Sequence, residues 1–167
     1  MNMLKFILFC FIGMSCGGCG IYSQSGASIP ADARTFSVSY IVNNASIVSP
    51  TLSQLLTEKL KTKFTNETPL KLTTGDADLH FSGKITNYTT APAGIQGDQQ
   101  NAISRLTVVV EITYEDKKDE TKNFTQTFSN FKDFNSQQDF AAIEAGLIAG
   151  ICDALVQDVF NKAFINW

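Results

Sequence analysis

The chain has 167 residues, with 13 Lys and Arg against 16 Asp and Glu and a formal net charge of −3. This mildly acidic balance argues against nucleic acid as a partner, because phosphates require a basic footprint. Hydrophobic residues make up 44% of the chain, which is enough for the core of one domain without metals or disulfides.

Residues 1–18 have the character of a lipoprotein signal peptide. The start is short and basic, and residues 4–14 are apolar but too few to span a bilayer as a permanent helix. Gly17 and Gly18 precede Cys19, and a lipoprotein peptidase requires small residues before the cysteine. We expect cleavage after residue 18 and a covalent diacylglycerol and N-acyl lipid on Cys19, with no other cofactor.

Two alternatives stand beside this interpretation. Cys16 occupies the position before Cys19 where a typical lipobox has Leu, which leaves open a looser export system or lipid attachment at Cys16, since Cys16 also follows a small residue. An ordinary secreted protein with an incidental cysteine is the other alternative. Cleavage would leave only Cys19 and Cys152, so we expect no disulfide framework. Cys152 lies in an apolar stretch and is predicted to be buried and unreactive.

Residues 19–34 are rich in Ser, Gly and Ala, and they predict an extended tether between the lipid and a single domain at residues 35–167. Alternating apolar and polar residues predict a first strand at residues 35–42. This alternation would place three side chains on one face: Phe36, Val38 and Tyr40.

A helix is expected to begin with Ser49 as its cap and Pro50 in its first turn. Its apolar side chains recur at helical spacing and predict a stripe that faces the core. These residues are Leu52, Leu55, Leu56, Leu60 and Phe64. We expect three lysines to lie on the solvated face of this helix. They are Lys59, Lys61 and Lys63.

Residues 70–72 predict a short edge strand, and residues 77–88 predict a longer one. Gly83 interrupts the longer strand, which indicates a bulge or a close approach of two backbones. Residues 89–101 lack apolar periodicity and predict a long connecting loop. The inward-facing residues of the longer strand are Leu79, Phe81 and Ile85.

Residues 103–115 alternate most clearly, and a charged turn joins them to residues 121–132, which predicts an antiparallel hairpin. From Ser136, the expected cap, to about Phe164 the pattern becomes helical. The order β-α-β-β-β-α predicts an α+β fold. We expect a two-layer sandwich, with two helices packed on one face of a mostly antiparallel or mixed four-stranded sheet. The apolar side of the last helix has Phe140, Ile143, Leu147, Ile151, Leu155 and Val159.

No constellation for catalysis is complete in the sequence. Alternation places the one histidine, His80, on a strand face with Asp78 and Ser82. Residues two apart on a strand are about 6.5–7 Å apart, too far for the direct hydrogen bonds of a triad. Asp76, Asp78 and His80 lack the further ligands that a metal site needs. We therefore expect a protein that is not an enzyme, with no catalytic residue and no metal.

Five segments share their order with a known family. They are residues 19–30 (CGIYSQSGASIP), 49–52 (SPTL), 81–88 (FSGKITNY), 105–108 (RLTV) and 159–167 (VFNKAFINW). In this order the chain resembles the LptE family. The resemblance implies a non-catalytic outer-membrane lipoprotein that plugs and stabilises the LptD β-barrel and assists lipopolysaccharide transport and insertion. It also implies a lipid-anchored domain on the periplasmic side or inside the barrel lumen.

The resemblance further implies contact with lipopolysaccharide through basic side chains that pair with lipid A phosphates. The candidates are Lys84 and Arg105, on strands whose outer faces could be presented together. Three lysines of the hairpin turn are interleaved with acidic residues and are equally well explained as solvated charge. They are Lys117, Lys118 and Lys122. The alternative function is a periplasm-facing lipoprotein that binds a small ligand or peptide through residues 92–100, without a barrel partner.

Overall fold

The computed structural model describes residues 29–47, 49–95 and 102–165. The expected signal peptide, both Cys16 and Cys19, and most of the expected tether lie outside these residues. In chain order the elements are β1 (Thr35–Val38), β2 (Val42–Asn43), α2 (Leu52–Glu67), β3 (Lys71–Leu72), β4 (Leu79–Ile95), β5 (Ala102–Asp116), η2 (Glu120–Lys122), β6 (Phe124–Asn135) and α3 (Phe140–Phe164).

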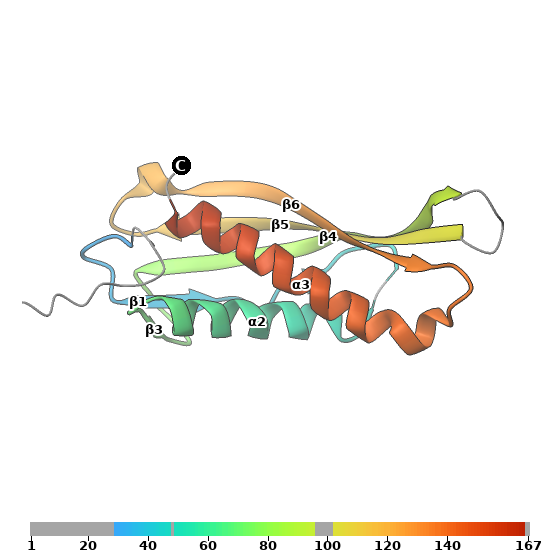
Figure 1. The fold of residues 1–167 in the computed structure, drawn as a ribbon. Helices are drawn as coiled ribbons and strands as arrows, with labels where there is room; N and C mark the ends of the chain where they lie inside the picture. The colour runs from blue at the N-terminus through green and yellow to red at the C-terminus, as the bar shows by residue number, and fades with distance from the viewer. Residues whose placement is uncertain (1–28, 48, 96–101, 166–167) are drawn as a thin grey trace, which may run out of the picture.

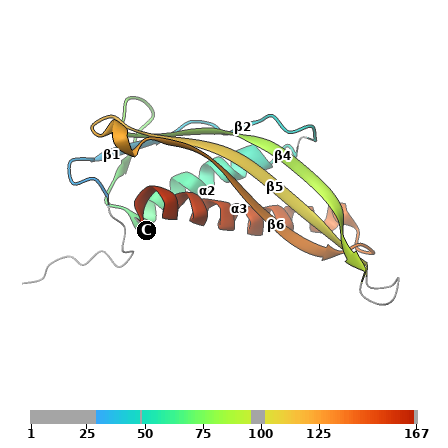
Figure 2. The same cartoon turned by 90° about the horizontal axis from the view of Figure 1, so that it is seen from above.

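The strands form one mixed sheet in the order β3-β1-β4-β5-β6, and β2 also pairs with β4. β1 is parallel to β3 and β4, whereas β4, β5 and β6 are antiparallel neighbours. Both helices cover the same face of the sheet (Figures 1 and 2). The predicted α+β sandwich is therefore confirmed. Its sheet has four strands of four residues or more, and β2 and β3 add two residues each.

The core lies between the sheet and the helices. Every second side chain of β5 is buried from Leu106 to Tyr114, and the apolar stripe of α2 is buried except for its half-buried Leu55. Phe64 of α2 lies at the centre of an aromatic cluster. Its ring centroid is 4.5 Å from that of Phe81 and 5.5 Å from that of Phe164. The periodicity in the sequence therefore predicted the core-facing sides of these elements correctly.

α3 is buried mainly along its second half. Ile148 and the residues that follow it on the same face are buried, whereas Phe140, Ile143 and Leu147 are only half-buried. By length and composition alone this helix would suffice to cross a membrane. Its buried face instead packs on the sheet and α2, as expected for the core helix of a sandwich.

The first predicted strand is interrupted, because the chain leaves the ladder between β1 and β2. Tyr40 is 59% exposed and Ile41 is fully buried, so the prediction that Phe36 and Tyr40 share one face is wrong. The cause lies in α2. The N–H of Ile41 donates to Thr57 Oγ1 at 3.0 Å, which draws this part of the chain toward the helix.

β4 is longer than predicted, because residues 89–95 belong to the strand and not to a loop. These residues pair with β5 as far as Ile95 and Ala102, so the connection shrinks to residues 96–101, outside the described residues. Residues 89–94 are exposed on both faces of the strand. Their sequence therefore has no alternation of apolar and polar residues that would indicate a strand. Pro92 is tolerated in β4 because β2 pairs with this strand only up to Ile85. Beyond Ile85 the edge of β4 away from β5 is open, so no described strand there requires an N–H from Pro92.

Both helices begin later than predicted. The cap position of α2 is Thr51, and the predicted cap, Ser49, contributes only its backbone carbonyl to this turn. α3 begins after Asp139, whose carboxylate accepts a backbone N–H of the first turn. Ser136, the predicted cap, continues the hairpin instead, because its N–H donates to the carbonyl of Ala102 at 2.9 Å.

Candidate functional site

The helix-free face of the sheet carries both predicted lipopolysaccharide contacts. Lys84 of β4 lies opposite Glu111 of β5, and its Nζ is 2.8 Å from Glu111 Oε1. Arg105 of β5 lies opposite Asp133 of β6 and donates two hydrogen bonds to that carboxylate, of 2.7 Å from Nε and 3.0 Å from Nη2. Each cation is therefore already paired with a carboxylate of the neighbouring strand.

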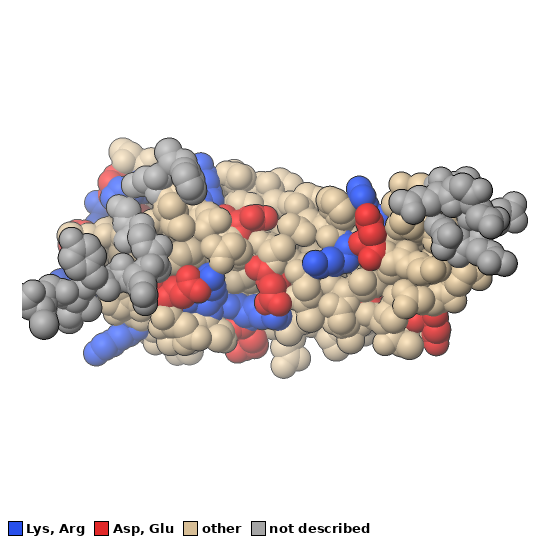
Figure 3. Space-filling view, viewed as in Figure 1, with Lys and Arg blue, Asp and Glu red and all other residues tan. Residues whose placement is uncertain are grey.

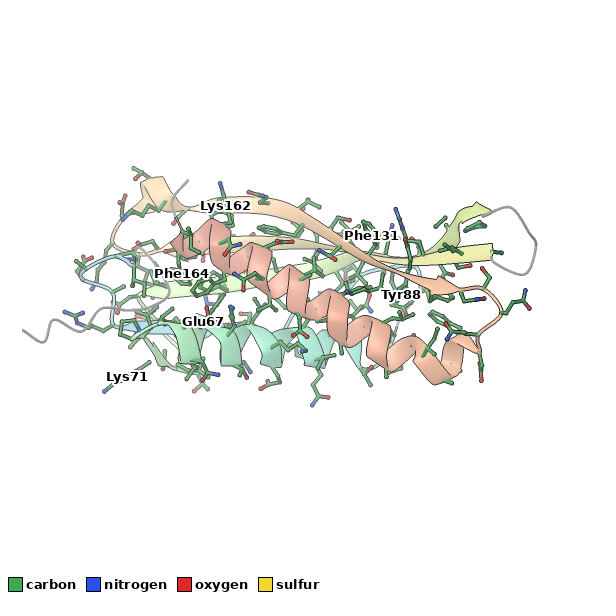
Figure 4. The ribbon with its side chains drawn as sticks, in the orientation of Figure 1. Glu67, Lys71, Tyr88, Phe131, Lys162 and Phe164 are labelled. Carbon is green, nitrogen blue, oxygen red and sulfur yellow. The ribbon has the colours of Figure 1, made fainter. Side chains whose placement is uncertain are left out.

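Arg105 is also stacked on an aromatic ring. The central carbon of its guanidinium lies 3.7 Å from the ring centroid of Phe131, which is 46% exposed on β6 (Figure 4). The hydrogen bonds to Asp133 raise the pKa of Arg105, and the same bonds lower the pKa of Asp133. A guanidinium has five N–H donors. Those not used by Asp133 remain available to a phosphate on this face of the sheet.

Lys84 and Arg105 lie on one face but do not form one cluster. Glu111, the ladder partner of Lys84, is six residues from Arg105 along β5, which is a rise of about 20 Å. One phosphate group cannot reach both side chains while they keep their present ion pairs. The two cations could only contact separate parts of an extended ligand.

The other lysines singled out in the sequence are in surface ion pairs. Figure 3 shows blue and red side chains next to one another on the helix side, without a broad patch of one sign. Exposed pairs of this kind each contribute about 0–1 kcal/mol. The pairs are Lys117–Asp76, Lys118–Asp78 and Lys122–Asp119 near the hairpin turn, and Lys59–Asp153, Lys61–Glu58 and Lys63–Glu67 on α2.

His80 belongs to a polar cluster that sequence reasoning missed. Its Nδ1 lies 2.8 Å from Ser37 Oγ, and its Nε2 lies 3.2 Å from Ser39 Oγ. Parallel pairing of β1 with β4 brings Ser37 opposite His80, and no local pattern could have indicated that pairing. No carboxylate bonds this imidazole, and no group of three metal-ligating side chains occurs within the described residues. The cluster joins two strands.

Asp78 anchors the start of β1 to β4. Its carboxylate accepts the N–H groups of Arg34 at 2.8 Å and Thr35 at 3.0 Å, and it also accepts the Thr35 hydroxyl at 3.0 Å. Lys118 pairs with the other oxygen at 3.1 Å. The pKa of Asp78 is held well below its usual range, first by the Arg34 N–H, then by Lys118 and Thr35. This residue therefore has a structural role.

The low pKa of Asp78 predicts a dependence of stability on pH. Because folding lowers this pKa, the stabilisation is present above the unfolded value of about 4 and is lost as the pH falls below it. We expect Asp78→Asn to destabilise the protein at pH 7 and to flatten the loss of stability below pH 5, as measured by urea unfolding. Glu120→Gln, an exposed control, should keep the wild-type pH profile. Identical acid profiles for Asp78→Asn and wild type would contradict this role.

Cys152 is buried as predicted. No part of the residue is exposed, and burial raises the pKa of its thiol to about 12. The thiol is therefore protonated at neutral pH, where only a thiolate would be reactive.

A cavity of about 570 Å³ opens where α3 ends and β6 begins. Tyr114, Lys122, Phe124 and Lys162 line it, together with residues 29–31. Lys162, which Figure 4 labels at this end of the molecule, lies over the Phe124 ring at 5.6 Å from its centroid. The volume is in the range of small-molecule sites. Sequence reasoning missed this cavity because its lining comes from distant segments of the chain.

Comparison with solved structures supports the fold. A minor lipoprotein from Acinetobacter baumannii matches 78% of this chain and 91% of its own, at 15% identity and a TM-score of 0.51. A protein from Xanthomonas campestris matches 81% and 91%, at 12% identity and a TM-score of 0.54. A hypothetical protein from Chlamydia trachomatis matches 80% and 99%, at 8% identity and a TM-score of 0.54. At these identities the likeness is one of fold alone.

Comparison of the sequence with protein families is more specific. No curated protein matches the sequence significantly. A model of the LptE family, described as lipopolysaccharide-assembly, matches residues 33–163, which include all the described strands, all of α2 and all but the last residue of α3. The resemblance seen in the sequence is thereby confirmed, and the chain belongs to the LptE family.

Proposed function

We propose that this protein is a non-catalytic outer-membrane lipoprotein that plugs and stabilises an LptD-type β-barrel and assists lipopolysaccharide transport and insertion at the cell surface. The family match over residues 33–163 is the observation that carries the proposal. In this role the domain lies on the periplasmic side or within the barrel lumen. The anchor is a diacylglycerol and N-acyl lipid on Cys19.

The surface of the sandwich is suited to a barrel lumen. The helix-free sheet face is lined by hydroxyls and by ion pairs such as Lys84–Glu111 and Arg105–Asp133. Barrel interiors are polar, so such a face meets a compatible surface there. The four charges of these two ion pairs are neutralised by one another, which limits the desolvation penalty of enclosing them.

The partnership can be tested in native outer membranes. We would cross-link the membranes, purify the lipoprotein in mild detergent and identify co-purifying proteins by mass spectrometry. An LptD-type barrel in near-equal amount, with loss of surface lipopolysaccharide on depletion, would support the proposal. Recovery of the lipoprotein alone, with intact surface lipopolysaccharide after depletion, would reject it.

The lipid attachment site gives a separate prediction. We expect Cys19→Ser to abolish incorporation of radiolabelled palmitate and to release the protein from the membrane, because no acylated cysteine remains after cleavage. Cys16→Ser is the matched control and should keep both the label and membrane attachment. The opposite result would assign the lipid to Cys16.

Contact with lipopolysaccharide is predicted to depend on competition at Arg105. A phosphate must share or displace the guanidinium from Asp133, so we expect Asp133→Asn to strengthen lipopolysaccharide binding and Arg105→Gln to weaken it. Each effect should be about threefold to tenfold, the range of one charge-assisted hydrogen bond near the surface. The affinity of the immobilised protein for purified lipopolysaccharide is the measured quantity. Lys71→Gln is the control, and Lys84→Gln tests the second candidate residue. Unchanged binding by Arg105→Gln would remove Arg105 from the site.

Ligand binding without a barrel partner is the second candidate function. The segment expected from the sequence to bind such a ligand, residues 92–100, belongs to β4 as far as residue 95 and lies outside the described residues beyond it. The cavity beside Lys162 is its remaining support. A lipoprotein purified without a barrel but with a bound small molecule would favour it.

A further inference from the structure

Within the described part of the chain, β6 leaves one edge of the sheet unpaired. It is the last strand in the order β3-β1-β4-β5-β6, and its one described partner is β5. The pairing runs in unbroken register along β6, whereas the pairing of β4 with β5 has two register shifts. In Figures 1 and 2, β6 follows the margin of the sheet, and no described helix or strand continues the sheet beyond it.

Two hydrogen bonds show which backbone groups of β6 point away from β5. Ser136 N–H donates to the carbonyl of Ala102 at 2.9 Å, so even-numbered residues exchange hydrogen bonds with β5. Phe131 N–H donates instead to the side chain of Asn130 at 2.9 Å, as expected for an odd-numbered residue. The odd-numbered residues therefore direct N–H and C=O toward the free edge. They are Thr125, Thr127, Ser129, Phe131 and Asp133, all exposed.

The free edge of β6 lacks the usual protection against strand pairing. Natural sheets shorten their edge strands, or place lysine, proline or a bulge on them. β3, at the other margin, has two residues and begins with Lys71. β6 has 12 residues, with no proline, no bulge and no charge from Phe124 to Phe131. Its composition and geometry suit main-chain pairing with another strand.

We propose that the free edge of β6 is the docking surface for an extended segment of the barrel protein, which adds to the sheet as one more strand. The inference rests on the proposed function. Main-chain hydrogen bonds from the odd-numbered residues hold the segment, and the uncharged side chains from Phe124 to Phe131 favour a neutral one. The closed wall of a barrel has no free edge, so the segment belongs to one of its longer loops.

Proline substitution separates edge pairing from folding. Thr127→Pro removes an N–H that faces away from β5, and an edge strand tolerates this change. Ser129→Pro is a second variant of the same kind. Thr127→Val keeps the N–H and is the matched control. Gln126→Pro removes an N–H that bonds to β5, so it shows how a damaged ladder affects thermal unfolding of the purified full chain.

The measured quantity is the amount of barrel protein retained per lipoprotein from native outer membranes. We expect Thr127→Pro and Ser129→Pro to retain about tenfold less barrel, since each removes a buried main-chain hydrogen bond and places a ring in the interface. Both should unfold near the wild-type temperature, whereas Gln126→Pro unfolds well below it. Thr127→Val should retain the barrel as wild type does.

Equal retention of the barrel by wild type and by both folded proline variants would overturn the edge proposal and leave the proposed function intact. Absence of the barrel from the wild-type preparation would reject both. A photo-cross-linker at position 127 identifies the occupant directly. We expect a cross-link to a loop of the barrel protein, and a product of two lipoprotein chains would show instead that a second copy occupies the edge.

Discussion

Phe64→Ala is expected to lower the free energy of unfolding by about 3–5 kcal/mol. Phe64 is fully buried, and its ring contacts those of Phe36, Phe81, Phe160 and Phe164. Alanine would remove the ring and leave a cavity between α2, the sheet and the end of α3. Urea denaturation followed by circular dichroism would measure the change.

Phe131→Ala is the matched control for Phe64→Ala. The same atoms are removed, but Phe131 is 46% exposed on the helix-free face and leaves no internal cavity. We expect a loss below about 1 kcal/mol, mainly from the contact with Arg105. Equal losses for the two variants would mean that the aromatic cluster does not organise the core.

Gly83→Ala is expected to cost about 1–3 kcal/mol, because the added methyl group has no room. A Cβ at this position would lie 2.3 Å from the carbonyl oxygen of Glu111 and 2.8 Å from Cδ1 of Ile112. The oxygen belongs to the backbone of β5 and cannot move without separating the strands. The close backbone approach expected from the sequence is therefore confirmed, whereas the nearest register shift lies between Ile85 and Asn87.

Gly94→Ala provides the comparison on the same strand. A Cβ there would meet no heavy atom within 4 Å, so we expect a change within about 0.5 kcal/mol. Thermal unfolding of both variants, measured side by side, distinguishes crowding at Gly83 from a general preference for glycine in β4. A Gly83→Ala protein as stable as Gly94→Ala would contradict the crowding argument.

The sequence predicted elements well where one face is buried and the other is not. α2 and β5 have this property, and their apolar stripes matched the core. Residues 89–94 lack it, because both faces of β4 are exposed there, beyond the sandwich. The ladder with β5 holds this part of the strand in place. Ser136 has suitable cap chemistry, but its hydrogen bond to Ala102 keeps it in the hairpin, and α3 begins after Asp139.

The candidate site was only partly predictable, because it depends on which strands pair and in which register. Alternation placed Lys84 and Arg105 on the outer faces of strands, and both lie there. Their carboxylate partners and the Phe131 ring depend on the register between strands, which local sequence does not specify. The pairing of His80 with Ser37 also depends on strand register, so the sequence could not predict it between two residues 43 positions apart.

By itself, the sequence determined the family, the order of the elements and the inward-facing residues of α2 and β5, because these follow from local periodicity and motif order. Only the tertiary structure decided that β1 runs parallel to β4, that the two cations lie far apart on one face, and that β6 keeps a free edge. These features arise from strand pairing between distant segments, whose register is set by the packed core.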